Sequence, residues 1–267
     1  MLRRHSGRIR QHLTLRWVEP GNHTGSRKTI EFNGAKFLSS VNDSLYVYGE
    51  DGLTLWALLH RRRELLSACG VDSTESSDFR FYYRPSFGRG GPLRKQLGEF
   101  DFIVSCPGLV ILGESKWHRN EDVEADREGI LRLDPRQISR HQLFCYWCRA
   151  WWEGGRHNWR VWQIKAQSYL KTEGIVVPVP KANSRVFSNL SYLLTDIEKH
   201  GNRCCPTFSN LLLYFYDNND VEYLKRKSLP KRTEQDFNLL LMDYSASMHG
   251  TFVAVDTPLF CNLGLLL

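Results

Sequence analysis

The stretch that most constrains the fold is a pair of apolar runs between Gly98 and Trp117, GEFDFIVSCPGLVILGESKW, because both runs contain charged residues. Asp101 stands in the first run, and Glu114 and Lys116 stand near the end of the second. A charge inside an apolar strand costs free energy unless it is paired or binds something. The Cys-Pro-Gly turn between the runs predicts a β-hairpin. We therefore interpret the stretch as two paired strands with functional charges at one end.

These charges have the chemistry of a metal site. Residues two apart in a strand point to the same side, so Glu114 and Lys116 project together and Ser115 points away. Pairing of the strands brings Asp101 alongside them. Two carboxylates bind a hard cation such as Mg²⁺ or Mn²⁺, with the Ser115 carbonyl as a further candidate ligand. Such a cation polarises a phosphate, and the lysine would position water or stabilise developing charge. The alternative is a salt bridge on an exposed sheet surface.

The rest of the pattern predicts a mixed sheet with helices packed on it. Leucines at helical spacing before the stop signal at Gly70 predict one helix, and Pro135 marks the start of another. The predicted helices cover residues 53–70, 135–152 and 187–201, and the predicted strands cover 78–85, 99–106, 108–117, 174–182, 209–218 and 250–256. A further hairpin is predicted over 29–41. The central order is a helix, three strands, a helix, a strand, a helix and a strand.

Asp101, an apolar run and the Glu-Ser-Lys triplet that begins at Glu114 resemble the PD-(D/E)xK nuclease superfamily, over roughly residues 50–217. The resemblance implies an α/β, restriction-endonuclease-like fold: a mixed β-sheet flanked by α-helices, here with N- and C-terminal additions. It implies Mg²⁺-dependent hydrolysis of phosphodiester bonds, with DNA favoured over RNA, in defence, mobile-element processing or repair. Asp101 and Glu114 would hold the metal and Lys116 would handle the water. Phe100 stands where the family motif has proline.

Two further roles follow from the resemblance. Many members place an acidic residue on the first helix, where Glu50, Asp51 and Glu64 compete. With Leu55 facing the core, helical geometry turns Glu64 toward solvent, which favours Glu50 or Asp51; Glu50 is taken as the additional metal ligand. Some members carry a glutamine near the scissile phosphate on the helix after the third strand, and Gln137 fits that position.

Positive charge predicts an anionic partner. The formal net charge is +7 and the sequence pI is about 9.1, a balance typical of many nucleic-acid-binding proteins. A basic, glycine-rich loop follows the strand predicted at 78–85, and it could follow a phosphate backbone. The candidate contacts are Arg84, Arg89, Arg94 and Lys95, with Arg140 on the next helix. A solvated hairpin loop is the alternative.

Cysteine spacing offers a second metal hypothesis. Cys145 and Cys148 are three residues apart, His141 lies one helical turn earlier, and Cys204 and Cys205 could complete a zinc or iron–sulfur site. Because the pair lies in an aromatic helical segment, we favour small buried hydrophobes instead. The seven cysteines lack the regular spacing of a secreted disulfide scaffold, which predicts a reducing, cytoplasmic location.

The chain is long enough for one large domain with appendages. We predict an N-terminal extension (1–45), a nuclease-like core (46–220) and a C-terminal addition (221–267) that packs on the core. No apolar run reaches the length of a transmembrane helix, so no membrane partner is expected. The alternative function is a catalytically inactive nucleic-acid-binding or scaffold subunit, and a homodimer or a larger protein complex stays open.

Overall fold

A computed structural model describes residues 29–32, 35–38, 44–71, 79–87, 98–118, 125–156, 158–175, 179–200, 204–226, 228–234, 236–245, 252–254 and 259–264. The helices are α1 (Gly49–His60), α2 (Arg62–Ala68), α3 (Pro135–Ala150), η1 (Trp151–Gly155, a π-helical turn), α4 (Trp159–Thr172), α5 (Arg185–Lys199) and α6 (Val221–Arg226). The strands are β1 (Thr29–Phe32), β2 (Ala35–Leu38), β3 (Ser44–Tyr48), β4 (Arg80–Tyr83), β5 (Phe102–Cys106), β6 (Leu109–Trp117), β7 (Ile130–Leu131), β8 (Thr207–Tyr216), β9 (Arg232–Thr233), β10 (Asn238–Asp243), β11 (Phe252–Ala254) and β12 (Leu259–Gly264).

The central sheet has five strands in the order β10-β8-β6-β5-β4. Strands β4, β5 and β6 form an antiparallel meander, whereas β8 runs parallel to β6 and β10 runs parallel to β8. The predicted hairpin is confirmed, because β5 and β6 pair from Cys106 opposite Leu109 to Phe102 opposite Gly113. Gly108 closes its turn with φ of 80°, a conformation that glycine adopts without strain.

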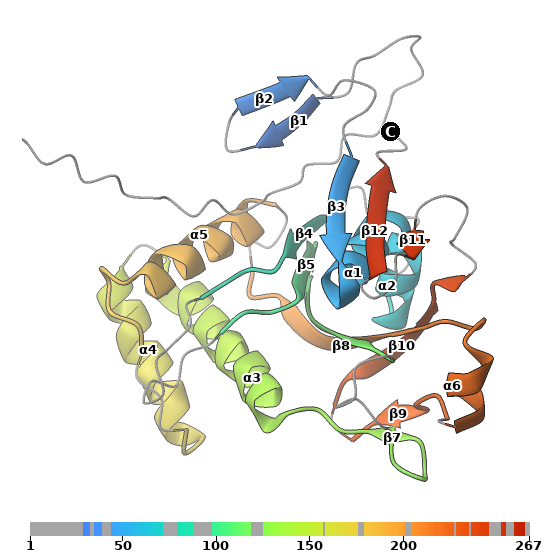
Figure 1. Cartoon of the computed structure of the whole chain (residues 1–267). Coiled ribbons are helices and arrows are strands. Elements are labelled where there is room, and N and C mark those ends of the chain that lie inside the picture. The colour runs from blue at the N-terminus through green and yellow to red at the C-terminus, as the bar shows by residue number, and fades with distance from the viewer. Residues whose placement is uncertain are drawn as a thin grey trace, which may run out of the picture.

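Helices cover both faces of the sheet (Figure 1). Helices α1 and α2 pack on one face, and α3, α4 and α5 pack on the other. The alternation of a strand sorts β6 between the two cores, since Ile111 packs with the first set of helices and Leu112 with the second. This mixed α/β arrangement confirms the predicted fold class in outline.

Three features differ from the prediction. In the segment predicted as a strand over 174–182, the residues that the structure describes (174–175 and 179–182) are not in a strand. The single helix expected over 53–70 is two helices, because Arg61 leaves the helical conformation with φ of −117° and ψ of 28°. The C-terminal addition was expected to pack on the core, and it also supplies a strand that was not predicted, β10, which forms one edge of the central sheet.

Three smaller sheets of the described chain pair short strands outside the central sheet. Strands β1 and β2 form the hairpin predicted over 29–41, and β7 pairs with β9. Strand β12 pairs antiparallel with both β3 and β11. Within the described residues, no helix has the length and apolar character needed to cross a membrane.

Candidate functional site

Two carboxylates bracket Lys116 at the end of β6. Asp101 directly precedes β5, and its Oδ2 accepts a hydrogen bond of 2.7 Å from the Ser115 amide. Glu50 lies in the first turn of α1, and its Oε2 accepts a 3.0 Å bond from the Trp117 amide. The structure therefore brings Glu50 of α1 and Asp101, next to β5, to two main-chain amides near the end of β6, those of Trp117 and Ser115.

Lys116 lies within electrostatic range of both carboxylates. Burial raises the pKa of Glu50 and of Asp101, and the Lys116 charge opposes that rise at both carboxyls. The Lys116 side chain is half-buried. Beyond the main-chain pairing of β6 with β8, the Lys116 side chain forms no hydrogen bond or ion pair with another residue that the structure describes. Its amine is thus available to a bound group without breaking such a contact.

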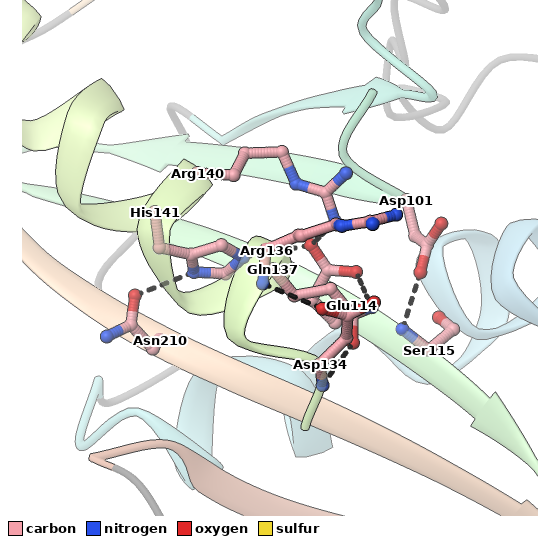
Figure 2. A network of polar contacts seen from close by, with 9 residues as sticks. All are labelled: Asp101, Glu114, Ser115, Asp134, Arg136, Gln137, Arg140, His141 and Asn210. Atoms are coloured by element: carbon pink, nitrogen blue, oxygen red, sulfur yellow. Dashed lines mark hydrogen bonds and ion pairs between the residues drawn. The ribbon is translucent and has the colours of Figure 1, made fainter. Parts of the chain in front are cut away.

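Glu114 points away from this cluster and toward α3 (Figure 2). Its side chain is 1% exposed, which rules out the alternative of a salt bridge on an exposed sheet surface. Oε2 accepts a bond from Gln137 Nε2 at 2.6 Å, and Oε1 accepts one from Arg140 Nη2 at 2.5 Å and lies 3.0 Å from His141 Nε2. Both carboxylate oxygens are therefore engaged by one helix.

The sequence of α3 explains this arrangement. Asp134 is the N-cap, Pro135 follows it, and Gln137 Oε1 accepts a 3.3 Å bond from the Asp134 amide, which completes a capping box. Gln137, Arg140 and His141 are spaced by three and four residues, so they share one face of the helix. The cap also orients the Gln137 amide, because its oxygen is used and its nitrogen turns to Glu114.

A residue on β8 extends the network beyond the predicted site. His141 Nδ1 lies 2.8 Å from Asn210 Oδ1, and Asn210 Nδ2 donates to the Asp236 carbonyl at 3.2 Å. In the sequence, His141 was considered only as a possible metal ligand beside the cysteine pair. Asn210 was missed, although a polar residue that precedes the apolar run of β8 is a usable signal.

The pKa of Glu114 shifts in the opposite direction from those of Asp101 and Glu50. Burial alone would raise the pKa of Glu114, but the His141 hydrogen bond and the Arg140 charge outweigh it and hold the pKa below its usual value. Burial and the Glu114 and Glu50 charges raise the pKa of Asp101 to about 7. Burial likewise raises the pKa of Glu50. Asp101 and Glu50 thus form a half-buried, crowded pair that a cation would stabilise.

We compared this donor set with the Mg²⁺ or Mn²⁺ that the sequence resemblance implies. Carboxylates are the ligands that hard divalent cations prefer, so Asp101, Glu50 and Glu114 fit in chemical type. Within the described part of the chain, however, no three His, Cys, Asp or Glu side chains are grouped to hold a metal ion. The Ser115 hydroxyl accepts a 2.7 Å bond from Thr54, and a metal-binding role for its carbonyl stays a prediction.

The other acidic candidates lie elsewhere. Asp51 pairs with Arg84. Glu64 is 45% exposed and pairs with Arg61. Of the three alternatives for the first helix, Glu50 alone shares electrostatic interactions with Asp101, Glu114 and Lys116 among the residues described.

The predicted nucleic-acid contacts divide into two groups. Arg84 and Arg140 are engaged within the protein, Arg84 by Asp51 and by Glu99, whose Oε1 lies 2.7 Å from Arg84 Nε. Residues 88–97, which include Arg89, Arg94 and Lys95, lie outside the described residues.

The described cysteines form no cluster that could hold a metal ion. Cys148 is buried and Cys145 is half-buried in the aromatic core, and burial raises the pKa of Cys145 to about 12. High thiol pKa values oppose thiolate ligation, so these side chains act as the small hydrophobes that we favoured. No protein-family model, curated protein or solved structure matches the chain.

Proposed function

We propose that this chain is a metal-dependent nuclease that hydrolyses phosphodiester bonds of DNA. The observation that carries the proposal is the pair of half-buried carboxylates, Asp101 and Glu50, which accept hydrogen bonds from the main-chain amides that precede and follow Lys116 and interact electrostatically with its amine. Crowding such a pair beside the buried carboxylate of Glu114 is costly unless positive charge offsets it. The net charge of +7 favours a polyanionic substrate.

The order of elements supports the same proposal. Helix α1, the antiparallel meander β4-β5-β6, helix α3 and the parallel strand β8 follow one another as in the PD-(D/E)xK core. Asp101 directly precedes the second meander strand, and Glu114 and Lys116 lie on the third. This placement supports the catalytic roles that the resemblance implies for them.

Each residue has a distinct proposed role. Asp101 and Glu50, with Glu114, would hold Mg²⁺ or Mn²⁺, which supplies Lewis-acid stabilisation of the charge that develops on the phosphate. The Lys116 amine would position the attacking water and stabilise the same charge. Gln137 was predicted to contact the phosphate, but both ends of its amide are used, by Asp134 and by Glu114. We therefore assign it to the support of Glu114.

Cleavage assays test the proposal. Linear, circular and single-stranded DNA and RNA are incubated with Mg²⁺ or Mn²⁺, with EDTA as the metal-free arm. Lys116→Ala should lower the rate by at least about a hundredfold. Lys165→Ala is the matched control, because Lys165 lies on α4 and pairs with Glu153. Cleavage that survives EDTA, or that Lys116→Ala leaves unchanged, would contradict the proposal.

One observation favours a second candidate, a nucleic-acid-binding or scaffold subunit that does not cleave. Both Glu114 oxygens are occupied by donors of the protein itself, which is a stable arrangement for a structural carboxylate. This candidate predicts that DNA shifts in a gel with the protein, and that no product forms with either cation. Mn²⁺ would then also fail to bind in the absence of DNA.

A further inference from the structure

We infer that Arg84 is a positioning residue, which fixes where the carboxylates of Glu50 and Asp101 lie in the proposed site. This role rests on the proposed function and deepens it. It also replaces the expected contact of Arg84 with nucleic acid, because a residue that acts through its neighbours does not touch the substrate.

The backbone of Arg84 is held in an unfavourable conformation next to Asp101. Among the described residues other than glycine, Arg84 alone has a positive φ, 47°. This left-handed region costs free energy for any residue with a Cβ. The Arg84 amide donates a 3.0 Å hydrogen bond to the Asp101 carbonyl. Such conformations persist only where the surrounding structure holds them, and they are concentrated at functional sites.

Arg84 and Asp101 occupy an interruption in the sheet. The ladder of β4 and β5 ends at the residue before Arg84 and at the residue after Asp101. It resumes in the same register at an isolated bridge between Ser86 and Glu99. Within the interruption, the Asp101 side chain turns to the Ser115 amide of β6 (Figure 2). The hydrogen bond from Arg84 therefore holds the main chain of Asp101 at the point where its side chain leaves for β6.

The guanidinium of Arg84 joins the segment before β5 to the start of α1. Its Nε lies 2.7 Å from Glu99 Oε1, and its Nη1 pairs with Asp51 Oδ2. Asp51 directly follows Glu50 in the first turn of α1. The Asp51 carbonyl also accepts a 3.0 Å bond from the Tyr83 hydroxyl. One side chain therefore ties the turn that carries Glu50 to the segment that leads into Asp101.

The charge of this cluster argues against a direct contact with nucleic acid. Two carboxylates, those of Asp51 and Glu99, surround one guanidinium, so the cluster has a net negative charge. A phosphate would have to displace them from a side chain that is 33% exposed. Glycine would adopt the left-handed conformation without strain. Arginine at this position is explained by its planar fork, which can bind two carboxylates at once.

Steady-state cleavage of a DNA duplex with Mg²⁺ tests this role. Arg84→Ala should lower kcat by at least about tenfold and change KM by less than about twofold, because misplaced carboxylates impair the chemical step rather than binding. Arg156→Ala is the matched control, since Arg156 is 32% exposed and pairs with Glu198 at 2.7 Å outside the site. It should leave kcat and KM unchanged. A wild-type kcat in Arg84→Ala would overturn the inference.

Arg84→Gly separates positioning from stability. Glycine relieves the backbone strain and also removes the guanidinium, so this variant should unfold at a higher urea concentration than Arg84→Ala and still cleave as slowly. If Arg84 were merely structural, kcat would instead recover together with stability, which would contradict the inference. Arg84→Lys keeps the positive charge without the fork, and it should recover part of the lost kcat.

The salt dependence of DNA binding separates positioning from phosphate contact. Affinity for a short duplex is measured in the Lys116→Ala background, where the proposed function predicts that the duplex stays intact. The slope of log affinity against log salt should be the same with Arg84 and with Arg84→Ala, whereas loss of a phosphate contact would reduce it by about one and overturn the inference. A wild-type protein that cleaves no DNA removes the proposed function as well, whereas wild-type cleavage with an unchanged kcat in Arg84→Ala removes this inference alone.

Discussion

At the scale of single residues, two carboxylates from adjacent strands are stabilised in opposite ways. Glu114 receives three side-chain donors, two of them from basic residues. Asp101 receives one main-chain N–H at Oδ2. Glu114 is therefore stable as an anion in the metal-free protein, whereas Asp101 binds a proton more readily than an ordinary carboxylate. A bound cation would stabilise the Asp101 carboxylate more than the Glu114 carboxylate.

The raised pKa of Asp101 predicts that the free energy of unfolding depends on pH. The pKa of Asp101 rises from 3.8 to about 7 on folding, so its stabilising contribution is complete below about pH 4 and is lost as the pH rises to about 7. In EDTA, Asp101→Asn should therefore lose less stability than wild type between about pH 5 and about pH 8, by on the order of 1 kcal/mol per pKa unit. Urea denaturation at the two pH values measures this. Glu64→Gln, at an exposed position, should behave as wild type, and an identical pH dependence in all three proteins would refute the assignment.

Glu114→Gln should be strongly destabilising, because it leaves Arg140 without its carboxylate partner in a site that is nearly closed to water. Removing one member of a buried ion pair typically costs about 3–5 kcal/mol. Glu198→Gln is the comparison, since the Glu198–Arg156 pair is 24% and 32% exposed and should contribute about 1 kcal/mol or less. The free energies of unfolding of the two variants, measured against wild type, test this prediction. A loss in Glu114→Gln as small as that in Glu198→Gln would show that Glu114 is not structurally required.

At the scale of elements, Gly113 lets β5 and β6 pair next to the site. A Cβ at this position would lie 2.0 Å from the ring of Phe102, which is its partner across the strands. Gly113→Ala should therefore cost about 1–3 kcal/mol through overpacking. Phe102→Leu in the same chain should recover part of that loss. If a double-mutant cycle of Gly113→Ala and Phe102→Leu shows no coupling, the Phe102 ring moves aside without cost and the prediction is wrong.

The sequence was informative where local signals decide the structure. The hairpin of β5 and β6 follows from a turn between two apolar runs, and the start of α3 follows from Asp134 and Pro135. Strand alternation also places Glu114 and Lys116 on one face. These features depend on neighbouring residues, so one chain without relatives suffices to predict them.

Tertiary contacts decided the features that the sequence did not predict. Nothing local shows that α3 covers the face of the sheet that carries Glu114, so Arg140 was assigned to nucleic acid rather than to that carboxylate. Strand β10 was missed although its leucines, Leu239 to Leu241, form the same kind of apolar run as Leu211 to Leu213 of β8, which was predicted. The break at Arg61 was missed because the leucine spacing on both sides fits one continuous helix.

At the scale of the whole molecule, the C-terminal segment supports the site from the edge of the sheet. Strand β10 pairs with β8 as the edge strand, and Met242 and Tyr244 are buried in the core beneath α1 and α2. The Tyr244 hydroxyl accepts a 3.1 Å bond from the Trp117 indole. Trp117 in turn donates its amide to Glu50. Tyr244 is thus connected through Trp117 to Glu50, a candidate metal ligand.

This connection predicts that a chain ending at residue 220, the predicted core boundary, does not form a stable domain. Its loss of β10 exposes an apolar edge at β8 and removes the burial of Met242 and Tyr244, and exposed apolar edges promote aggregation. The fragment should aggregate or unfold without a cooperative transition in circular dichroism.

A chain ending at residue 245 keeps β10 and should retain a cooperative transition, although it lacks the pairing of β12 with β3. Tyr244→Phe isolates the hydrogen bond to Trp117 and should cost about 1 kcal/mol. Cooperative unfolding of the shorter fragment at the midpoint of the longer one would show instead that residues 46–220 are an autonomous core.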